Sequence, residues 1–183
     1  MKTMIVSLFL TLLPGAVLAD CASMWVTRNM VFDRAGYCFG SNLGKALFDN
    51  GGCIGKDVRL SSADQDFVDY TKEMETMFEC NIDTSRRTLN LPLLNQWLQL
   101  IDLPRRDYGG SGCLGYLGQP VTLRSGIGGG RVLGQVNPGD DIIFNHWDQA
   151  GRSFVTVMRN NREVSLGWAD LRMDQLPCRQ FAG

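Results

Sequence analysis

The sequence predicts an α+β fold, in which a small helical N-terminal domain and a linking helix precede a C-terminal five-stranded β-barrel. Two observations lead to this prediction. Apolar side chains recur at helical spacing up to residue 101, whereas short β-branched runs between glycine and proline turns follow from residue 119. We therefore expect the helical domain at residues 20–83, the linking helix and a loop at 84–112, and the barrel at 113–183.

Residues 1–19 have the pattern of a secretory signal peptide. Lys2 supplies a positive charge, residues 4–13 are almost wholly apolar, and Val17-Leu18-Ala19 offers a small-residue cleavage pattern. The apolar run has about half of the roughly 20 residues that a membrane-spanning helix needs. We therefore expect cleavage before Asp20, export to the periplasm or the exterior, and no membrane span.

The six cysteines all follow the expected cleavage point, and an even number of cysteines in an exported chain indicates disulfides. The chain has no C-x-x-C pair and a single histidine, His146, so neither a metal site nor another cofactor is expected. Many pairings are open to six cysteines. The preferred set keeps each bridge inside one domain and consists of Cys21–Cys80, Cys38–Cys53 and Cys113–Cys178.

Charge is nearly balanced, with a formal net charge of −1, and no lysine-rich block occurs. Nucleic acid is therefore not an expected partner. Every basic residue after Thr84 is an arginine. This usage fits either recognition of anions and carboxylates or an ordinary solvated surface, and the sequence leaves both interpretations open.

Three helices are expected in the N-terminal domain. Residues 24–36 place Trp25 and Phe32 on one face, residues 42–49 form a short second helix, and Ser61 can cap a third. The linking helix follows, with an apolar stripe made of Leu94, Trp97, Leu98 and Ile101. Pro92 suits the first turn of this helix, Pro104 ends it, and residues 105–110 are expected to form a loop.

The C-terminal part has the period of two that is typical of strands. The expected strands lie at residues 121–124, 131–136, 141–145, 153–159 and 166–169. Five short strands joined by tight turns favour a closed barrel, because closure leaves no exposed sheet edge.

This part resembles the bacterial SH3 (SH3b) family. The matching residues are Thr122-Leu123-Arg124-Ser125-Gly126, Val132 to Val136, Pro138-Gly139-Asp140, Trp147, Gly167-Trp168 and Leu171. The resemblance implies an SH3-like barrel that binds cell-wall peptide in a shallow aromatic groove. The candidate ligand-binding residues are then Tyr116, Arg124, Trp147, Arg152 and Trp168. One departure is clear, because Ile127-Gly128-Gly129-Gly130 stands where the family has a proline and a short turn.

The N-terminal domain resembles the YARHG domain, a presumed extracellular bacterial module with no known activity. The resemblance rests on Trp25, Arg28-Asn29, Phe32 to Tyr37, Phe39 and Leu47-Phe48. The pairing of this domain with an SH3-like tail also looks like a family of uncharacterised alphaproteobacterial exported proteins.

We therefore expect a non-enzymatic exported module that binds cell-wall peptide or an envelope protein. One alternative is a protein-interaction adaptor that acts through the N-terminal unit or the helix of Trp97. Another is a cell-wall hydrolase that uses His146 or the carboxylates of Glu73, Glu79 and Asp83.

Overall fold

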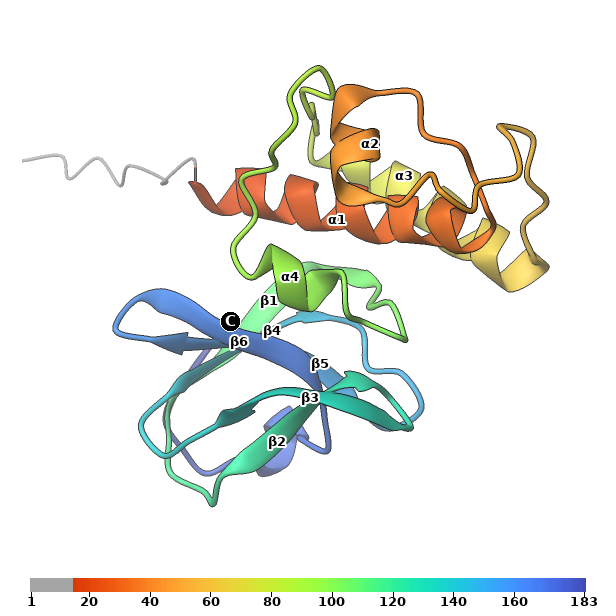
Figure 1. The fold of residues 1–183 in the computed structure, drawn as a ribbon. Helices are drawn as coiled ribbons and strands as arrows, with labels where there is room; N and C mark the ends of the chain where they lie inside the picture. The colour runs from red at the N-terminus through yellow and green to blue at the C-terminus, as the bar shows by residue number, and fades with distance from the viewer. Residues whose placement is uncertain (1–14) are drawn as a thin grey trace, which may run out of the picture.

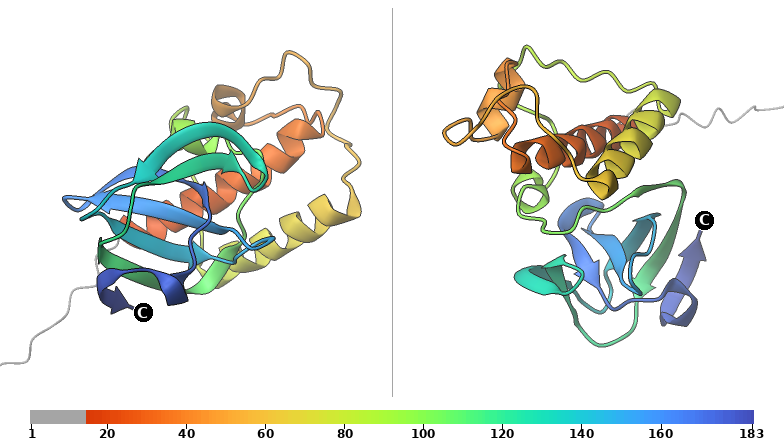
Figure 2. Two further views of the ribbon diagram at one scale, coloured as in Figure 1. Left: turned by 90° about the horizontal axis from the view of Figure 1, so that it is seen from below. Right: turned by 90° about the vertical axis from the view of Figure 1, so that its right-hand side faces the viewer.

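The computed structural model describes residues 15–183 and contains a helical layer above a curled antiparallel sheet (Figure 1). The right-hand view of Figure 2 shows the same two layers from the side, with the short helix α4 between them. Residues 1–14 of the expected signal peptide lie outside the described residues, and Gly15 to Ala19 are the first residues of helix α1. The signal peptide therefore stays a prediction.

The helical layer contains α1 (Gly15–Arg34), α2 (Asn42–Leu47) and α3 (Ser62–Met77). Helix α3 begins as predicted, because the side chain of Ser61 accepts a hydrogen bond from the backbone N–H of Asp64 at 3.1 Å. Helix α1 ends earlier than expected. The chain reverses at Gly36, which has a φ of +83° that glycine adopts without steric cost.

The linking helix α4 (Leu94–Trp97) is only one turn long. The prediction that Pro92 lies in its first turn is wrong, because Leu93 has a left-handed φ of +55° and separates Pro92 from the helix. Trp97 of the predicted apolar stripe is 4% exposed, whereas Ile101 lies beyond the helix and is 57% exposed. Trp97 belongs to a hydrophobic core that joins Trp25 and Leu43 of the helical layer to Phe154 and Trp168 of the sheet.

The sheet has seven strands in the order β3-β2-β6-β5-β4-β1-β7. They are β1 (Arg106–Tyr116), β2 (Val121–Gly126), β3 (Gly129–Val136), β4 (Asp141–His146), β5 (Ser153–Arg159), β6 (Arg162–Ala169) and β7 (Cys178–Ala182), with a 3₁₀ turn (Met173–Gln175) before β7. A second core, around Leu123, Ile142 and Val155, fills the sheet's concave side.

The prediction of a closed five-stranded barrel is wrong on both counts. Strands β3 and β7 stand at opposite ends of the strand order, so the sheet is open. Strand β1 replaces the loop expected at residues 105–110. The register between β1 and β4 shifts between Arg106 and Ser111. Gly109 and Gly110 lie in this irregular stretch, and these glycines are the reason that the sequence pattern indicated a loop.

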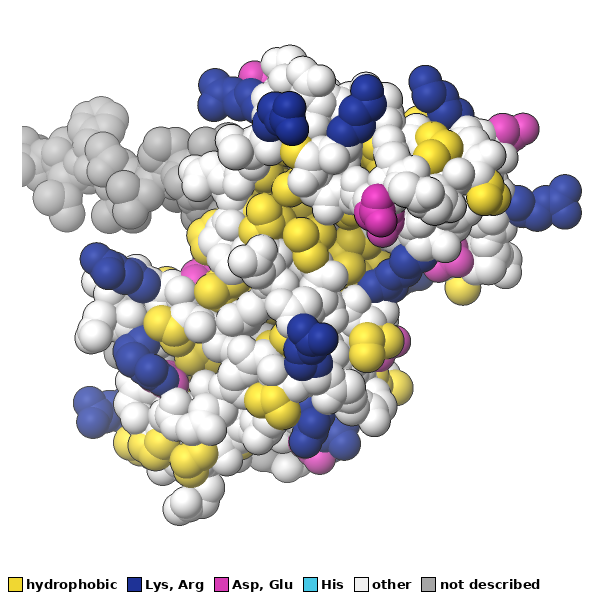
Figure 3. Space-filling model, in the orientation of Figure 1, with side chains coloured by type: hydrophobic (Ala, Val, Ile, Leu, Met, Phe, Trp, Pro, Cys, Tyr) yellow, Lys and Arg dark blue, Asp and Glu magenta, His cyan; other side chains and the backbone are white. Residues whose placement is uncertain are grey.

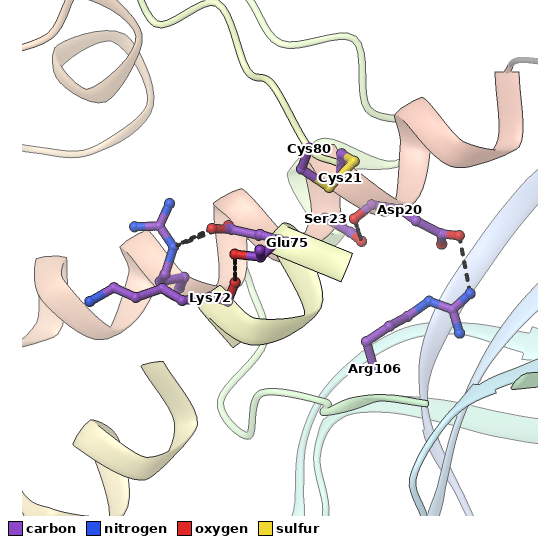
Figure 4. The surroundings of a disulfide bond; sticks show 9 residues. Asp20, Cys21, Ser23, Lys72, Glu75, Cys80 and Arg106 are labelled. Atoms are coloured by element: carbon purple, nitrogen blue, oxygen red, sulfur yellow. Dashed lines mark hydrogen bonds and ion pairs between the residues drawn. A yellow bond between two sulfur atoms is a disulfide. The ribbon is translucent and has the colours of Figure 1, made fainter. Parts of the chain in front are cut away.

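Three disulfides tie these elements together, Cys21–Cys80, Cys38–Cys53 and Cys113–Cys178, and they are the pairs of the preferred set. Figure 4 shows Cys21–Cys80 close to an ion pair between Asp20 and Arg106, whose closest atoms are 3.1 Å apart. This pair fastens the helical layer to β1. Within residues 15–183, no helix has the length and apolarity needed to cross a membrane.

Candidate binding site

The five candidate residues occupy three different environments. Tyr116 and Trp168 are core residues, with 4% and 2% of their surface exposed. The hydroxyl of Tyr116 donates to the carbonyl oxygen of Gln119 at 2.9 Å, and the indole of Trp168 donates to that of Asp102 at 2.9 Å. Both aromatic side chains are therefore fixed in place, and Tyr116 lies away from the two surface grooves that contain the other candidates.

The structure brings Arg124, Arg152 and Trp168 together in one groove of about 280 Å³, which we call the arginine groove. Its other lining residues are Val121, Thr122, Gly126 to Gly129, Ala169 and Asp170. Arg124 and Trp168 are register partners on β2 and β6, and this pairing places them side by side. Arg152 forms an ion pair with Asp170 at 3.2 Å. Asp170 had no role in the sequence prediction.

One end of the arginine groove is the glycine-rich turn between β2 and β3. The backbone N–H of Ile127 donates to a carboxylate oxygen of Asp102 at 2.7 Å, and that of Arg131 donates to the hydroxyl of Ser125 at 3.0 Å. Gly130 has a φ of +88°, and a Cβ at this position would lie 2.5 Å from the Ser125 hydroxyl. Glycine is therefore required at residue 130 by the local geometry.

Trp147 lies in a separate groove of about 280 Å³, which we call the tryptophan groove. Its lining residues are Asp107, Ser111, Phe144, His146, Trp147, Asp148, Ser153 and Met173. Trp147 is 47% exposed, and its indole N–H donates to the hydroxyl of Tyr70 at 3.0 Å. That hydroxyl donates in turn to the carbonyl oxygen of Arg106. This chain of contacts joins residues far apart in sequence, so no local pattern predicted it.

His146 forms the inner wall of the tryptophan groove and packs its ring against Trp97 and Phe154. Burial, and secondly the positive charge of Arg106, lower the pKa of His146 from 6.5 to about 3. The imidazole is therefore neutral at physiological pH. Behind it lies a cavity of about 10 Å³ lined partly by hydroxyl groups, into which Ser23, Thr27, Tyr70 and Thr71 project.

Charged side chains around the sheet do not form a single basic patch on the face shown in Figure 3. Among the described residues, no group of three or more His, Cys, Asp or Glu side chains is arranged to hold a metal ion. The two grooves differ in charge. The arginine groove contains two guanidinium groups and one carboxylate, whereas the tryptophan groove contains two carboxylates.

Comparison with protein-family models gives two matches. Residues 15–76 match the YARHG domain, which confirms the resemblance of the N-terminal unit. Residues 79–183 match a family described as "Domain of unknown function (DUF4453)". Neither a curated protein nor a solved structure matches the chain.

Proposed function

The chain belongs to the DUF4453 family, and from that premise we propose that it is an exported, non-enzymatic binding protein whose arginine groove takes a carboxylate-bearing peptide. The three disulfides and the YARHG domain fit an exported protein. The signal-like sequence of residues 1–19 supports a periplasmic or secreted location. The proposed ligand is the peptide part of the cell wall or a segment of an envelope protein.

The observation that carries the proposal is the placement of Arg124 beside Arg152 and Trp168 in one groove. Arg152 is neutralised by Asp170, whereas Arg124 has no carboxylate partner among residues 15–183. Its guanidinium donates to the carbonyl oxygen of Gly130 at 3.1 Å, which orients the group and leaves other N–H donors for a ligand. A planar guanidinium of this kind pairs well with a carboxylate.

We also propose that the sheet is related to SH3b domains. It is supported by the antiparallel pairing of β2 with β3 and β6, in which the matching residues Arg124 and Gly167-Trp168 lie together. Gly128 and Gly129 have no side chains to fill the groove, so this end of the groove is open. The SH3b pattern has a proline turn at this position. The departure from the SH3b pattern therefore favours a ligand whose charged end lies against the turn.

A non-enzymatic role is supported by the state of the candidate catalytic groups. A pKa of about 3 makes His146 a poor general base at neutral pH. All six cysteines are in disulfides, which removes thiolate nucleophiles. Hydrogen bonds from Ser85, and then from Arg86, lower the pKa of the exposed Asp83, so its carboxyl is not suited to donate a proton.

A retention assay with purified peptidoglycan tests the proposal. The mature protein and the control Arg162→Gln should be retained equally, because Arg162 is exposed at the opposite end of the β5–β6 hairpin. Arg124→Gln should lower retention at least fivefold. Equal retention of Arg124→Gln and the control, or no retention of the unchanged protein, would overturn the proposal. Soluble fragments released during the incubation would contradict the non-enzymatic role.

An adaptor function of the N-terminal unit is the second candidate, and Ile54 favours it. This side chain is 80% exposed beside Cys53, on a loop held by the Cys38–Cys53 disulfide and by a 2.7 Å hydrogen bond from its own N–H to the carbonyl oxygen of Gly36. A large apolar side chain on a constrained loop suits a protein contact. The alternative surface, Trp97, is buried and not accessible to a partner. In-cell cross-linking should recover fewer partners with Ile54→Ser than with the unchanged chain.

A further inference from the structure

We propose that the tryptophan groove is a second binding site, which takes the ammonium group of an aliphatic amine such as the side chain of a diamino acid in a peptide. This inference goes beyond the proposed function, because it involves none of the residues that line the arginine groove. Four features of the groove lead to it. They are its charge, the hydrogen-bonding contacts of Trp147 and Asp148, its apolar wall and its position relative to Arg152.

The charge of the groove is negative. Asp107 and Asp148 line it, and no lysine or arginine does. The arginines that neighbour the lining residues in sequence interact elsewhere in the structure, since Arg152 and Arg172 form ion pairs with Asp170 and Asp174. Arg106 forms the ion pair with Asp20, and the guanidinium of Arg105 lies over the ring of Tyr70, 5.6 Å from its centroid. A cation entering the groove therefore meets two carboxylates without a competing basic side chain on its walls.

Trp147 and Asp148, the two groups that we expect a cation to contact first, each lie within hydrogen-bonding distance of a neighbouring side chain. The indole N–H of Trp147 donates to the hydroxyl of Tyr70, which orients the ring, and Trp147 is 47% exposed. The hydroxyl of Ser153, which is 2% exposed, lies 2.7 Å from Oδ1 of Asp148 and 2.5 Å from the carbonyl oxygen of Leu171, so its single proton serves one of these two acceptors at a time. An aromatic side chain oriented by Tyr70, next to the carboxylate of Asp148, attracts an ammonium group through both cation–π and ionic interactions.

The apolar wall of the tryptophan groove favours a ligand whose ammonium group is carried by an aliphatic chain. Phe144 and Met173 line the groove, and its volume of about 280 Å³ is of the size that accommodates an amino-acid side chain. The neutral ring of His146 closes the inner end without adding positive charge. An alkyl ammonium can place its methylene groups against the apolar side chains while its charged end meets Asp107 and Asp148.

The tryptophan groove and the arginine groove are lined by consecutive residues at the start of β5. Arg152 lines one groove and Ser153 lines the other, because consecutive side chains of an extended segment point to opposite faces. The connection between β4 and β5 thus separates a carboxylate site from an ammonium site. A peptide that contains a diamino acid and a free carboxylate offers both groups.

Nuclear magnetic resonance titration with Nα-acetyl-lysine amide tests the inference on the mature protein. The indole N–H signal of Trp147, assigned by its loss in Trp147→Phe, should shift and saturate. The same probe acetylated on its ε-amine should give no shift, because it lacks the charge. Asp107→Asn and Asp148→Asn should each weaken binding of the lysine probe at least fivefold. The isosteric amide introduced at residue 148 keeps a polar group beside the Ser153 hydroxyl, so we expect the fold to be preserved.

Two matched variants separate this site from the rest of the protein. Arg124→Gln should bind the lysine probe normally even if it no longer binds peptidoglycan, and so should Asp66→Asn, whose exposed carboxylate lies on α3. Equal shifts with the acetylated probe, unchanged affinity in both Asp107→Asn and Asp148→Asn, or no shift at all would overturn the inference. Failure of the arginine-groove proposal would leave these results unaffected.

Discussion

The indole nitrogen of Trp147 donates a hydrogen bond to the hydroxyl of Tyr70 at 3.0 Å, across 77 residues of sequence. Trp147 follows β4 directly, and Tyr70 lies on α3. The same hydroxyl donates to the main chain of Arg106 at the start of β1. One tyrosine oxygen therefore joins the helical layer to β1 and to the residue that follows β4, and it also orients the exposed indole.

Tyr70→Phe should consequently destabilise the fold and loosen Trp147. The loss of two hydrogen bonds predicts a decrease of about 1–2 kcal/mol in the free energy of unfolding. Urea denaturation measures this decrease. The matched control is Tyr108→Phe, since the side chain of Tyr108 is 50% exposed and should lose less than about 0.5 kcal/mol. Equal effects of the two variants would show that the Tyr70 hydroxyl does not join the layers.

The buried His146 should make the fold less stable as the pH falls. The unfolded chain binds a proton near its ordinary pKa of 6.5, whereas the folded chain does so only near 3. Between these values the free energy of unfolding falls by about 1.4 kcal/mol per pH unit, which amounts to about 2 kcal/mol between pH 7.5 and 5.

Urea denaturation at several pH values measures this dependence, and His146→Gln supplies the comparison. The difference between the two proteins isolates the imidazole from carboxyls such as Glu163, whose pKa is raised by burial and which therefore act in the opposite direction. If both proteins had the same pH dependence between pH 7.5 and 5, His146 would not be neutral in the fold.

The sequence predicted those parts of the fold that depend on local patterns. Ser61 capped α3 as expected, and the predicted strand at 153–159 coincides with β5 (Ser153–Arg159). Strands β1 and β7 were not predicted, because their formation depends on partners that are distant in the sequence. Cys113 of β1 pairs with Phe181 of β7. The glycines of β1 are typical of loops, so its sequence did not indicate a strand.

The candidate site was predictable only in part, and for the same reason. Arg124 and Trp168 follow from a family resemblance, and the β2–β6 pairing places them together. Asp148 and Tyr70 carry no signal in the sequence, since their roles arise from contacts with Ser153 and Trp147 in the folded chain. A pattern of residue types identifies strands and turns, but it does not identify which polar groups meet between layers.

The ion pair of Asp140 and Arg159 should support the sheet at neutral pH. Asp140 is 3% exposed, and its carboxylate accepts hydrogen bonds from Arg159 at 2.7 and 2.8 Å and from the backbone of Asn137 at 2.8 Å. The bonds from Arg159, and then that from Asn137, lower the pKa of Asp140 below its ordinary 3.8. This stabilisation is therefore present above pH 3.8 and is lost as the pH falls through the lower folded pKa.

Asp140→Asn should decrease the free energy of unfolding by about 1–3 kcal/mol at pH 7, because it weakens charge-assisted bonds to a buried group. Thermal or urea unfolding measures the change. Asp174→Asn is the control, since its 3.6 Å pair with Arg172 is exposed and should contribute less than about 1 kcal/mol. The difference between the two variants should shrink as the pH approaches 3.

The glycines of the β2–β3 turn should differ sharply in their tolerance of alanine. At Gly130, alanine would adopt a φ of +88° and place its Cβ 2.5 Å from the hydroxyl of Ser125 and 2.8 Å from Ile101. At Gly128, a Cβ would meet nothing within 4 Å. Gly130→Ala should therefore destabilise the fold by about 1–3 kcal/mol, whereas Gly128→Ala should change its stability by less than about 0.5 kcal/mol.

Retention on peptidoglycan should separate the same two variants, because the carbonyl oxygen of Gly130 orients Arg124. Gly130→Ala should reduce retention below that of Gly128→Ala when both proteins are folded at the assay temperature. Circular dichroism of each variant establishes that condition. If Gly130→Ala and Gly128→Ala had the same stability and the same retention, the turn would not shape the arginine groove. Residues with side chains could then replace its glycines.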